Sequence, residues 1–213
     1  MLTQKIEKSG EFNVNGISFD EFRNTILKDY RIAVESRAAS ILGRKEVLTG
    51  KAKFGIFGDG KEVVQIAKAK SFKKGDFRSG YYRDQTFMFA LGMSTIQEYF
   101  AQLYAHADLQ EEPASGGRQM NCHFATRSID EKGEWKNLTE MYNSSADTSP
   151  TACQMARMLG LAHASKIYRE NKSLQEFKKF SNHGNEVVFG MIGDASTSEG
   201  VFWETINAAG VLK

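Results

Sequence analysis

The residues best placed for chemistry lie where a short apolar segment ends in a turn that carries one carboxylate. Residues 187–192 are rich in β-branched and aromatic side chains, which is typical of a strand buried on both faces. Gly193 allows a tight turn, and Asp194 follows it directly. Ser196 and Glu199 have the spacing of a capping box and predict a helix start. A carboxylate beside a helix N-terminus suits Mg²⁺ that bridges a bound phosphate, although an ordinary strand-turn-helix unit with Asp194 as a turn residue stays open.

A second candidate site lies in the connection over residues 73–85. It contains two arginines and two adjacent tyrosines, namely Arg78, Tyr81, Tyr82 and Arg83. Arg and Tyr donors together suit phosphate oxygens, because a guanidinium forms paired hydrogen bonds to them. The alternative is a solvated basic loop without a ligand, but exposed aromatic rings would gain little there.

Residues 110–149 predict no convincing helix or strand, and an irregular stretch of this length indicates a functional or a disordered loop. Cys122 and His123 within it are a tempting nucleophile and base. Adjacent residues of an extended segment point to opposite sides, so the two side chains cannot readily hydrogen-bond each other. His123 as a proton donor or a substrate contact stays open.

The segment after this loop has strong helix signals, with Ser149 as the expected N-cap and Pro150 at the first helical position. A row of small side chains follows at four-residue spacing: Ala152, Ala156, Gly160 and Ala164. Such a row lets another backbone approach closely, so we expect this helix to pack on a partner.

Other elements are placed by their apolar patterns. Helices are predicted over residues 18–50 and 62–70 and from Ser94, where Gln97 completes a cap. The segment 187–192 is the single confident strand. A lone parallel strand cannot satisfy its hydrogen bonds, and an α/β unit continues with a strand after the last helix. We therefore expect an incomplete unit, completed by a longer polypeptide or by partner chains.

Composition is ordinary for a globular protein, with 41% hydrophobic and 25% charged residues among 213. A net charge of +2 gives no indication of a nucleic acid or membrane partner. No apolar run approaches transmembrane length, and the N-terminus lacks an apolar signal region. Cys122 and Cys153 form no CxxC pair, so a reducing cytoplasm is the simplest expectation. We expect an N-terminal arm over residues 1–17 and a domain over 18–213.

Four stretches, in order along the chain, resemble the alpha part of the thiamine diphosphate-dependent 2-oxo acid dehydrogenases, over roughly residues 30–213. They are 79–84, 117–124, 149–154 and 193–207. The second contains Gly-Arg-Gln-Met and is similar to the branched-chain subgroup. The resemblance implies an α/β thiamine diphosphate-binding fold, with a parallel sheet flanked by helices. Residues 18–213 would be its N-terminal portion.

The resemblance implies a role for each matching residue. Tyr82 and Arg83 would hold the cofactor diphosphate, and the backbone at Ser149 and Thr151 would hold the aminopyrimidine ring. His123 would reach the active site as the catalytic residue.

In the last matching stretch, the turn formed by Gly193, Asp194 and Ala195 would contact the cofactor, and Asp194 would be the first ligand of Mg²⁺. Potassium near the Ser149 turn is possible, because some family members bind it there.

The chain departs from the family pattern at two positions. Ala195 stands where the motif has a glycine, and Asn121 stands where branched-chain members usually have proline. The closing Asn-Asn of the motif, which supplies the second magnesium ligand, lies beyond Lys213. The glutamate that protonates the aminopyrimidine belongs to the beta part.

The implied activity is oxidative decarboxylation of a branched-chain 2-oxo acid of the 2-oxoisovalerate type, with acyl transfer to a lipoyl group. Pyruvate is the alternative substrate, and a non-catalytic assembly fragment is the alternative for the isolated chain. The implied partners are the beta part, fused or separate, and a lipoyl-bearing acyltransferase within an oligomer.

Overall fold

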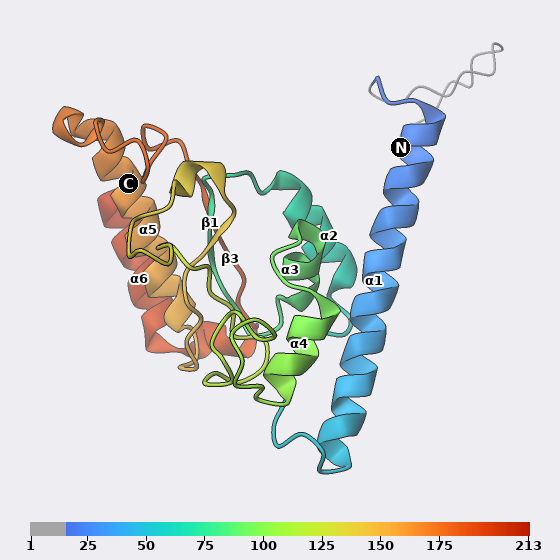
Figure 1. Cartoon of the computed structure of the whole chain (residues 1–213). Coiled ribbons are helices and arrows are strands. Elements are labelled where there is room, and N and C mark those ends of the chain that lie inside the picture. The colour runs from blue at the N-terminus through green and yellow to red at the C-terminus, as the bar shows by residue number, and fades with distance from the viewer. Residues whose placement is uncertain (1–15) are drawn as a thin grey trace.

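The computed structural model describes residues 16–213, which run from one long helix to a helix at the other end (Figure 1). The α-helices are α1 (Phe19–Leu48), α2 (Glu62–Ser71), α3 (Gln85–Leu91), α4 (Ile96–Leu103), α5 (Cys153–Glu170) and α6 (Gly200–Leu212). The strands are β1 (Phe77–Ser79), β2 (Asn143–Ser144) and β3 (Val188–Gly190), and the short 3₁₀ helices are η1 (Leu138–Glu140), η2 (Lys172–Leu174) and η3 (Ala195–Ser198). Most of the predicted arm, residues 1–15, lies outside the described residues.

The strands form one parallel sheet in the order β2-β1-β3, with Phe77 of β1 opposite both Asn143 and Val188. The α/β class with a parallel sheet flanked by helices is therefore confirmed. The predicted strand over 187–192 contains β3, but the sheet has two further strands, β1 and β2, which are only three and two residues long. Segments this short cannot develop the alternation or the apolar run that marks a strand in sequence.

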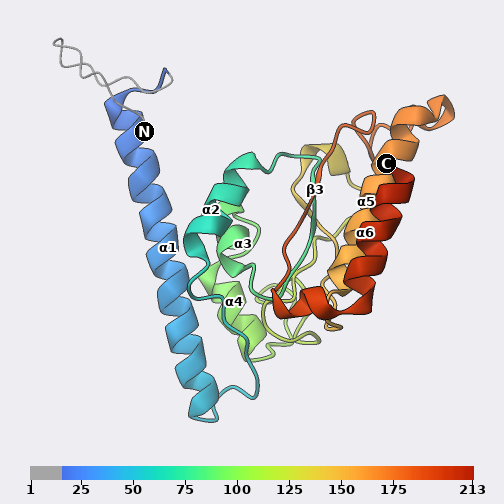
Figure 2. The ribbon, with the colours of Figure 1, turned by 180° about the vertical axis from the view of Figure 1, so that it is seen from behind.

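Helices cover both faces of the sheet (Figures 1 and 2). The helices α5 and α6 pack together on one face, α2, α3 and α4 lie on the other, and α1 borders the second group. In parallel sheets of this kind, ligands bind beyond the carboxyl ends of the strands. The segments that leave those ends are residues 80–84, 145–152 and 191–199. Three of the four stretches that carry the family resemblance, 79–84, 149–154 and 193–207, overlap these segments, and 117–124 does not. Within residues 16–213, no helix is long and apolar enough to cross a membrane.

An aromatic core fills the space between the sheet and the helices α2–α4. The Phe72 ring lies 5.1 Å from that of Phe87 and 5.2 Å from that of Phe189, both edge-to-face. Phe87 and Tyr99 are completely buried. This packing ties β3 to α2 and α3, so it fixes the strand ends against the helices that follow them.

The predicted helix starts have mixed outcomes. Ser18 and Glu21 form the predicted capping box, in which the Glu21 N–H donates to Ser18 Oγ and the Ser18 N–H donates to Glu21 Oε2. The start predicted at Ser94 is one residue early, because Thr95 and Glu98 form the capping box of α4.

Two predicted helix starts at the carboxyl edge of the sheet are wrong. Helix α5 begins at Cys153 and not directly after Ser149, because Ala152 has a φ of 62° that interrupts a right-handed helix. Ser196 caps no helix; it lies buried within η3, and α6 begins at Gly200. In both places irregular backbone follows the strand where a regular helix was expected.

The row of small residues on α5 does not pack on the body of the chain as a continuous stripe. Ala152 is buried, whereas Ala156 and Gly160 are exposed, and no atom lies within 4 Å of a Cβ built on Gly160. The prediction that this row packs on a partner stays a prediction.

Candidate functional site

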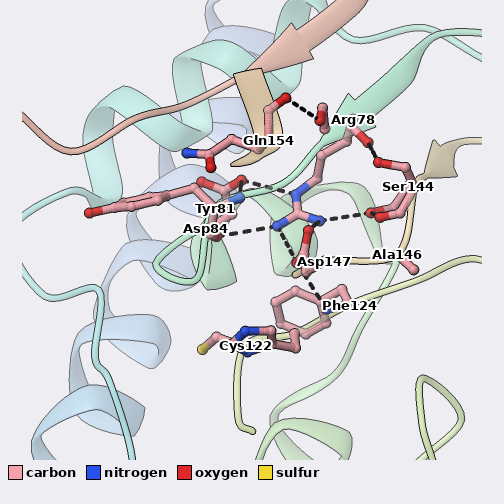
Figure 3. Close-up of polar contacts among 12 residues, drawn as sticks. Arg78, Tyr81, Asp84, Cys122, Phe124, Ser144, Ala146, Asp147 and Gln154 are labelled. Atoms are coloured by element: carbon pink, nitrogen blue, oxygen red, sulfur yellow. Dashed lines mark hydrogen bonds and ion pairs between the residues drawn. The ribbon is translucent and has the colours of Figure 1, made fainter. Parts of the chain in front are cut away.

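A buried arginine is the centre of the carboxyl edge of the sheet (Figure 3). Arg78, in β1, has no exposed surface. Its Nε donates to Asp84 Oδ2 at 3.0 Å, and Nη1 and Nη2 donate to the two carboxylate oxygens of Asp147 at 3.1 and 2.9 Å. Nη1 also donates to Ser144 Oγ at 2.7 Å, and Nη2 donates to the Tyr81 carbonyl at 3.3 Å. Bidentate pairing of this kind holds both partners in a fixed geometry.

The Arg78 cluster, defined as Arg78, Asp84, Asp147 and Ser144, joins the segments that carry the predicted site residues. Asp84 accepts from the Tyr81 N–H at 3.1 Å and so closes the turn that contains Tyr82 and Arg83. Asp147 Oδ2 accepts from the Phe124 N–H at 3.0 Å, next to His123, and the Asp147 N–H donates back to the Phe124 carbonyl. The cluster therefore sets the relative positions of three loops.

Close packing around the guanidinium requires a glycine at position 80. A Cβ on Gly80 would lie 2.0 Å from Asp147 Oδ1 and 2.1 Å from Arg78 Nη1, which no side chain tolerates. The ring of Phe124 covers the guanidinium at 5.6 Å from its centroid. The cluster is thus sealed from solvent by packing.

A buried lysine, Lys68, lies near the cluster and has no hydrogen bond among residues 16–213. Burial opposes the charge of Arg78, but Asp147 and Asp84 outweigh that effect and its pKa is raised. Lys68 Nζ and Asp84 Oδ1 are both buried without a hydrogen-bond partner among residues 16–213. Burial lowers the pKa of Lys68 to about 8, although Asp84 favours its charged form. The Lys68 ammonium lies 4.5 Å from the centroid of the Phe87 ring.

A tyrosine-arginine group lies directly beside the turn after β3. Arg83 donates through Nη1 to the hydroxyl of Tyr81 and lies 4.9 Å from the centroid of the Tyr82 ring. Its carbonyl accepts from the fully buried Gln65 at 2.6 Å, so the backbone is fixed by α2. Arg83 forms no ion pair with any acidic group of residues 16–213. A half-buried guanidinium without a carboxylate partner is available to an anion.

Tyr81 connects this group to Gly193. A Cβ on Gly193 would lie 2.8 Å from the Tyr81 hydroxyl oxygen, so a glycine lets the two segments meet. Burial is the main cause that raises the pKa of Tyr81 to about 12, and hydrogen bonding with Tyr82 adds to it. Tyr81 therefore keeps its proton at physiological pH and remains a hydroxyl donor.

The turn after β3 presents one carboxylate to solvent. Asp194 and Ala195 are exposed, and Asp194 caps η3 without a side-chain hydrogen bond. The Asp194 carbonyl accepts from Thr197 through both N–H and Oγ1, at 3.0 and 2.6 Å. The backbone of the turn is thus fixed while the carboxylate stays free. Among residues 16–213, no group of three or more His, Cys, Asp or Glu side chains could hold a metal ion.

His123 and Ser149 are brought together by the fold. His123 is buried, and its Nε2 lies 3.4 Å from Ser149 Oγ. Its Nδ1 lies 3.2 Å from the Asn121 carbonyl oxygen, which accepts if Nδ1 carries the proton. Gln102 brackets the backbone of His123: its Nε2 donates to the His123 carbonyl at 2.7 Å, and its Oε1 accepts from the His123 N–H. These contacts leave Nε2 facing the Ser149 turn.

The hydrogen bonds of the Cys122 thiol go to Asn121 and Gln85 and not to His123, although the segment is a turn with a φ of 60° at Cys122 and not the extended chain that was assumed. Its thiol is fully buried beside Gln85 Oε1 at 3.6 Å, and burial raises its pKa. A thiol that stays protonated in a closed environment is no nucleophile.

The turn after Ser149 holds a strained residue but few contacts. Thr151 is exposed, and among residues 16–213 no backbone acceptor is found for the N–H groups of Ser149 and Thr151. Ala152 is buried with its positive φ, a backbone state that costs energy in non-glycine residues. Two free N–H groups on a fixed turn can bind a ligand's acceptors.

The structure brings the predicted site residues together in two groups and leaves one residue apart. Tyr82 and Arg83 lie with Gly193 through Tyr81, and His123 lies with Ser149, whereas Thr151 contacts neither group by a side-chain hydrogen bond. The Arg78 cluster that joins them was not predicted from the sequence. The signal available was an arginine six residues before an aspartate in a connection already marked as unusual.

Comparison with known proteins identifies the family. The model of the Dehydrogenase E1 component matches residues 30–213, most of the chain. The chain belongs to this family. A relative, the 2-oxoisovalerate dehydrogenase subunit alpha 1, mitochondrial, of Arabidopsis thaliana, is 25% identical over 165 residues, which are 77% of this chain and 28% of the relative. The chain thus spans less than a third of the length of the relative that it matches.

Membership of this family implies dependence on thiamine diphosphate, and the described residues fit the diphosphate end of that cofactor. Arg83 is a guanidinium without an acidic partner among residues 16–213, Tyr82 is a half-buried phenol beside it, and Asp194 is an exposed carboxylate on the adjoining turn. These are the donors and the oxygen ligand that a magnesium-bound diphosphate requires.

Proposed function

We propose that the chain belongs to an enzyme that oxidatively decarboxylates a branched-chain 2-oxo acid, and that its own share is to anchor the diphosphate of thiamine diphosphate and its Mg²⁺. The observation that carries this proposal is the half-buried Arg83, which has no acidic partner among residues 16–213 and lies against two tyrosines beside the turn of Asp194. When bound, the cofactor supplies the electron sink for decarboxylation.

The residues of this chain bind and orient. Arg83 and the half-buried Tyr82 would donate to diphosphate oxygens, while the buried Tyr81 holds the Arg83 guanidinium through its hydroxyl. Asp194 gives one oxygen ligand to Mg²⁺, with Gly193 and Ala195 forming the turn that presents it. Magnesium prefers oxygen ligands, so Asp194 would hold it together with the diphosphate.

The His123 group forms the other half of the proposed site. The N–H groups of Ser149 and Thr151 hold the aminopyrimidine ring, and the same turn is the proposed position of potassium. His123 Nε2, which faces this turn at 3.4 Å from Ser149 Oγ, orients the substrate or donates a proton to it. The hydrogen-bonding contacts of Nδ1 and of the backbone keep the imidazole in this orientation.

The proposed partners are a beta part, separate or fused, and a lipoyl-bearing acyltransferase that takes the acyl group. Alpha subunits of this family generally pair with such partners. The exposed Ala156 and Gly160 on α5 support a close helix contact with another chain. Free thiols at Cys122 and Cys153 support a reducing compartment, and we propose the cytoplasm.

Cofactor anchorage is tested by the variant Arg83→Ala in the complete enzyme. We expect its affinity for thiamine diphosphate in the presence of Mg²⁺ to fall by about tenfold to a hundredfold, because a charge-assisted pair is lost. Calorimetric titration measures this, with the exposed Arg127→Ala as the matched control. Equal affinity in the Arg83 variant and the wild type would remove Arg83 from the site.

Substrate class is tested by turnover of 2-oxoisovalerate against pyruvate with an artificial electron acceptor. The Gly-Arg-Gln-Met sequence at residues 117–120 and the name of the Arabidopsis relative favour the branched-chain acid. We expect a higher kcat/KM for 2-oxoisovalerate. A strong preference for pyruvate would replace the proposed substrate while leaving cofactor anchorage intact.

A further inference from the structure

A groove lies beside the segment that leads to His123. It holds about 430 Å³ and is bounded by the loop after α1, the end of α4 and the segment that leads to His123. Its lining includes three basic and three large apolar or aromatic side chains: Lys51, Lys53, Arg118, Phe54, Tyr104 and Met120. Sites for small organic ligands commonly have about 300–1,000 Å³. The groove contains none of the residues assigned to cofactor, metal or substrate above.

The positive charge of the groove is only partly neutralised by the chain. Glu46, the acidic group that faces it, lies 3.5 Å from Lys51 and accepts from the Tyr104 hydroxyl at 2.8 Å. Lys53 and Arg118 have no acidic partner among residues 16–213, and Arg118 Nη1 donates to the Ser115 carbonyl. Two cations therefore remain for an anionic ligand.

The wall beside these cations is apolar and accessible. Phe54 is 48% exposed and Met120 is 38% exposed, and both line the groove next to the buried Leu103. Apolar side chains gathered beside uncompensated cations match a ligand with a hydrocarbon body and an anionic end. A purely ionic ligand would leave this apolar surface in water.

The floor of the groove is formed by residues that also hold His123. Gln102 and Asn121 line it, and Gln102 brackets the His123 backbone from both sides. The Asn121 carbonyl contacts His123 Nδ1, while its side-chain amide exchanges hydrogen bonds with the backbone of Ile56 at 3.1 and 3.2 Å. A ligand that contacts Gln102 and Asn121 would therefore restrain the two residues that hold the backbone and the ring of His123.

We propose that the groove binds an organic anion with an apolar body, of the class of medium-chain carboxylates, at a site separate from the cofactor. The carboxylate lies between Lys53 and Arg118, and the hydrocarbon chain lies on Phe54 and Met120. This inference goes beyond the proposed function, because none of its residues binds the diphosphate.

The test is calorimetric titration of the complete enzyme at low salt with hexanoate, hexanol and acetate, since salt screens exposed charges. We expect hexanoate to bind about tenfold or more tightly than either of the other probes, because only hexanoate uses both halves of the groove. Lys53→Ala together with Arg118→Ala should weaken hexanoate binding by about tenfold. Met120→Ala should weaken hexanoate and leave acetate unchanged.

Matched controls separate this site from the others. Lys45→Ala removes an exposed lysine of α1 that does not line the groove, and hexanoate affinity should stay unchanged. Arg83→Ala should lower cofactor affinity without altering hexanoate binding, so the two proposals fail independently. Equal binding of hexanoate and acetate, or no effect of the double variant, would overturn the proposal. Tighter binding of a hexaglutamate peptide than of hexanoate would also overturn it, in favour of a protein partner.

Discussion

Around Arg78 the guanidinium and its two carboxylate partners are buried and bonded to one another, whereas the turn after β3 leaves the Asp194 carboxylate in solvent. Both regions lie at the carboxyl edge of the same parallel sheet. The Arg78 guanidinium has its carboxylate partners within the chain, whereas the turn after β3 has a fixed backbone and an Asp194 carboxylate that makes no capping hydrogen bond. The difference separates residues that position the site from residues that bind to it.

This separation has an energetic basis. Burying charges is costly and becomes tolerable only when geometry and hydrogen bonds are nearly ideal, as they are for Arg78 with Asp147. An exposed carboxylate has no such cost and contributes little to stability. Substitutions in the first region should therefore change folding, and substitutions in the second should change ligand binding.

The largest effect is expected for Arg78→Met, which leaves Asp84 and Asp147 buried without their cation. We expect the free energy of unfolding to fall by about 3–5 kcal/mol, because removing one partner of a buried ion pair strands the other. Urea unfolding of the protein measures this, with Arg127→Met as a control at an exposed arginine. A loss below about 1 kcal/mol, the range of surface ion pairs, would contradict the buried-cluster interpretation.

The next effect is expected for Asp194→Asn, which keeps shape and removes charge. Stability should change by less than about 0.5 kcal/mol, because the side chain is exposed and caps nothing. Magnesium-dependent cofactor affinity should fall by at least about tenfold to a hundredfold, the range known for groups that only support a metal ligand. Titration of the enzyme with thiamine diphosphate, with and without Mg²⁺, separates the magnesium-dependent part of the cofactor affinity from the part that does not need the metal.

Glu199→Gln is the matched control for Asp194→Asn, because Glu199 is an exposed carboxylate on the same segment without a side-chain capping bond. Its cofactor affinity should equal that of the wild type. Full magnesium-dependent activity in Asp194→Asn would return Asp194 to the role of an ordinary turn residue.

The same contrast explains what the sequence could predict. Arg83, Gly193 and Asp194 belong to short sequence motifs. Each is positioned by its neighbours in the chain, so a pattern of a few residues is enough to identify it. Arg78 is paired with Asp147, 69 positions away, and only the parallel pairing of β1 with β2 brings them together. A charged residue in a three-residue strand gives no sign that it is buried.

Helix starts show the limits of local signals near the site. Ser18 and Glu21 cap α1 as predicted, because the capping box bonds residues three positions apart at an exposed helix end. At Ser149 the same kind of signal fails, since Ala152 is held in a left-handed conformation and Ser149 faces His123 instead. Tertiary contacts override capping preference where the chain forms a site.

The last effect depends on pH and is expected from Lys68, a buried cation near Asp84 that has no hydrogen-bond partner among residues 16–213. Burial lowers its pKa to about 8 from 10.5, so between these values the folded state binds fewer protons than the unfolded state. Stability should therefore rise as pH increases from about 8 to about 10.5, by on the order of 3 kcal/mol.

Lys68→Met should abolish this rise, since no proton is then released on folding, while Lys74→Met at an exposed lysine should keep it. Urea unfolding at intervals from pH 7 to pH 11 measures the difference between the two variants, because other titrating groups are common to both. Lys68→Met should also be at least as stable as the wild type at pH 7, where the wild type must bury an ammonium. A lower stability of Lys68→Met at pH 7 would instead show that the ammonium is needed to balance Asp84, and would join Lys68 to the Arg78 cluster.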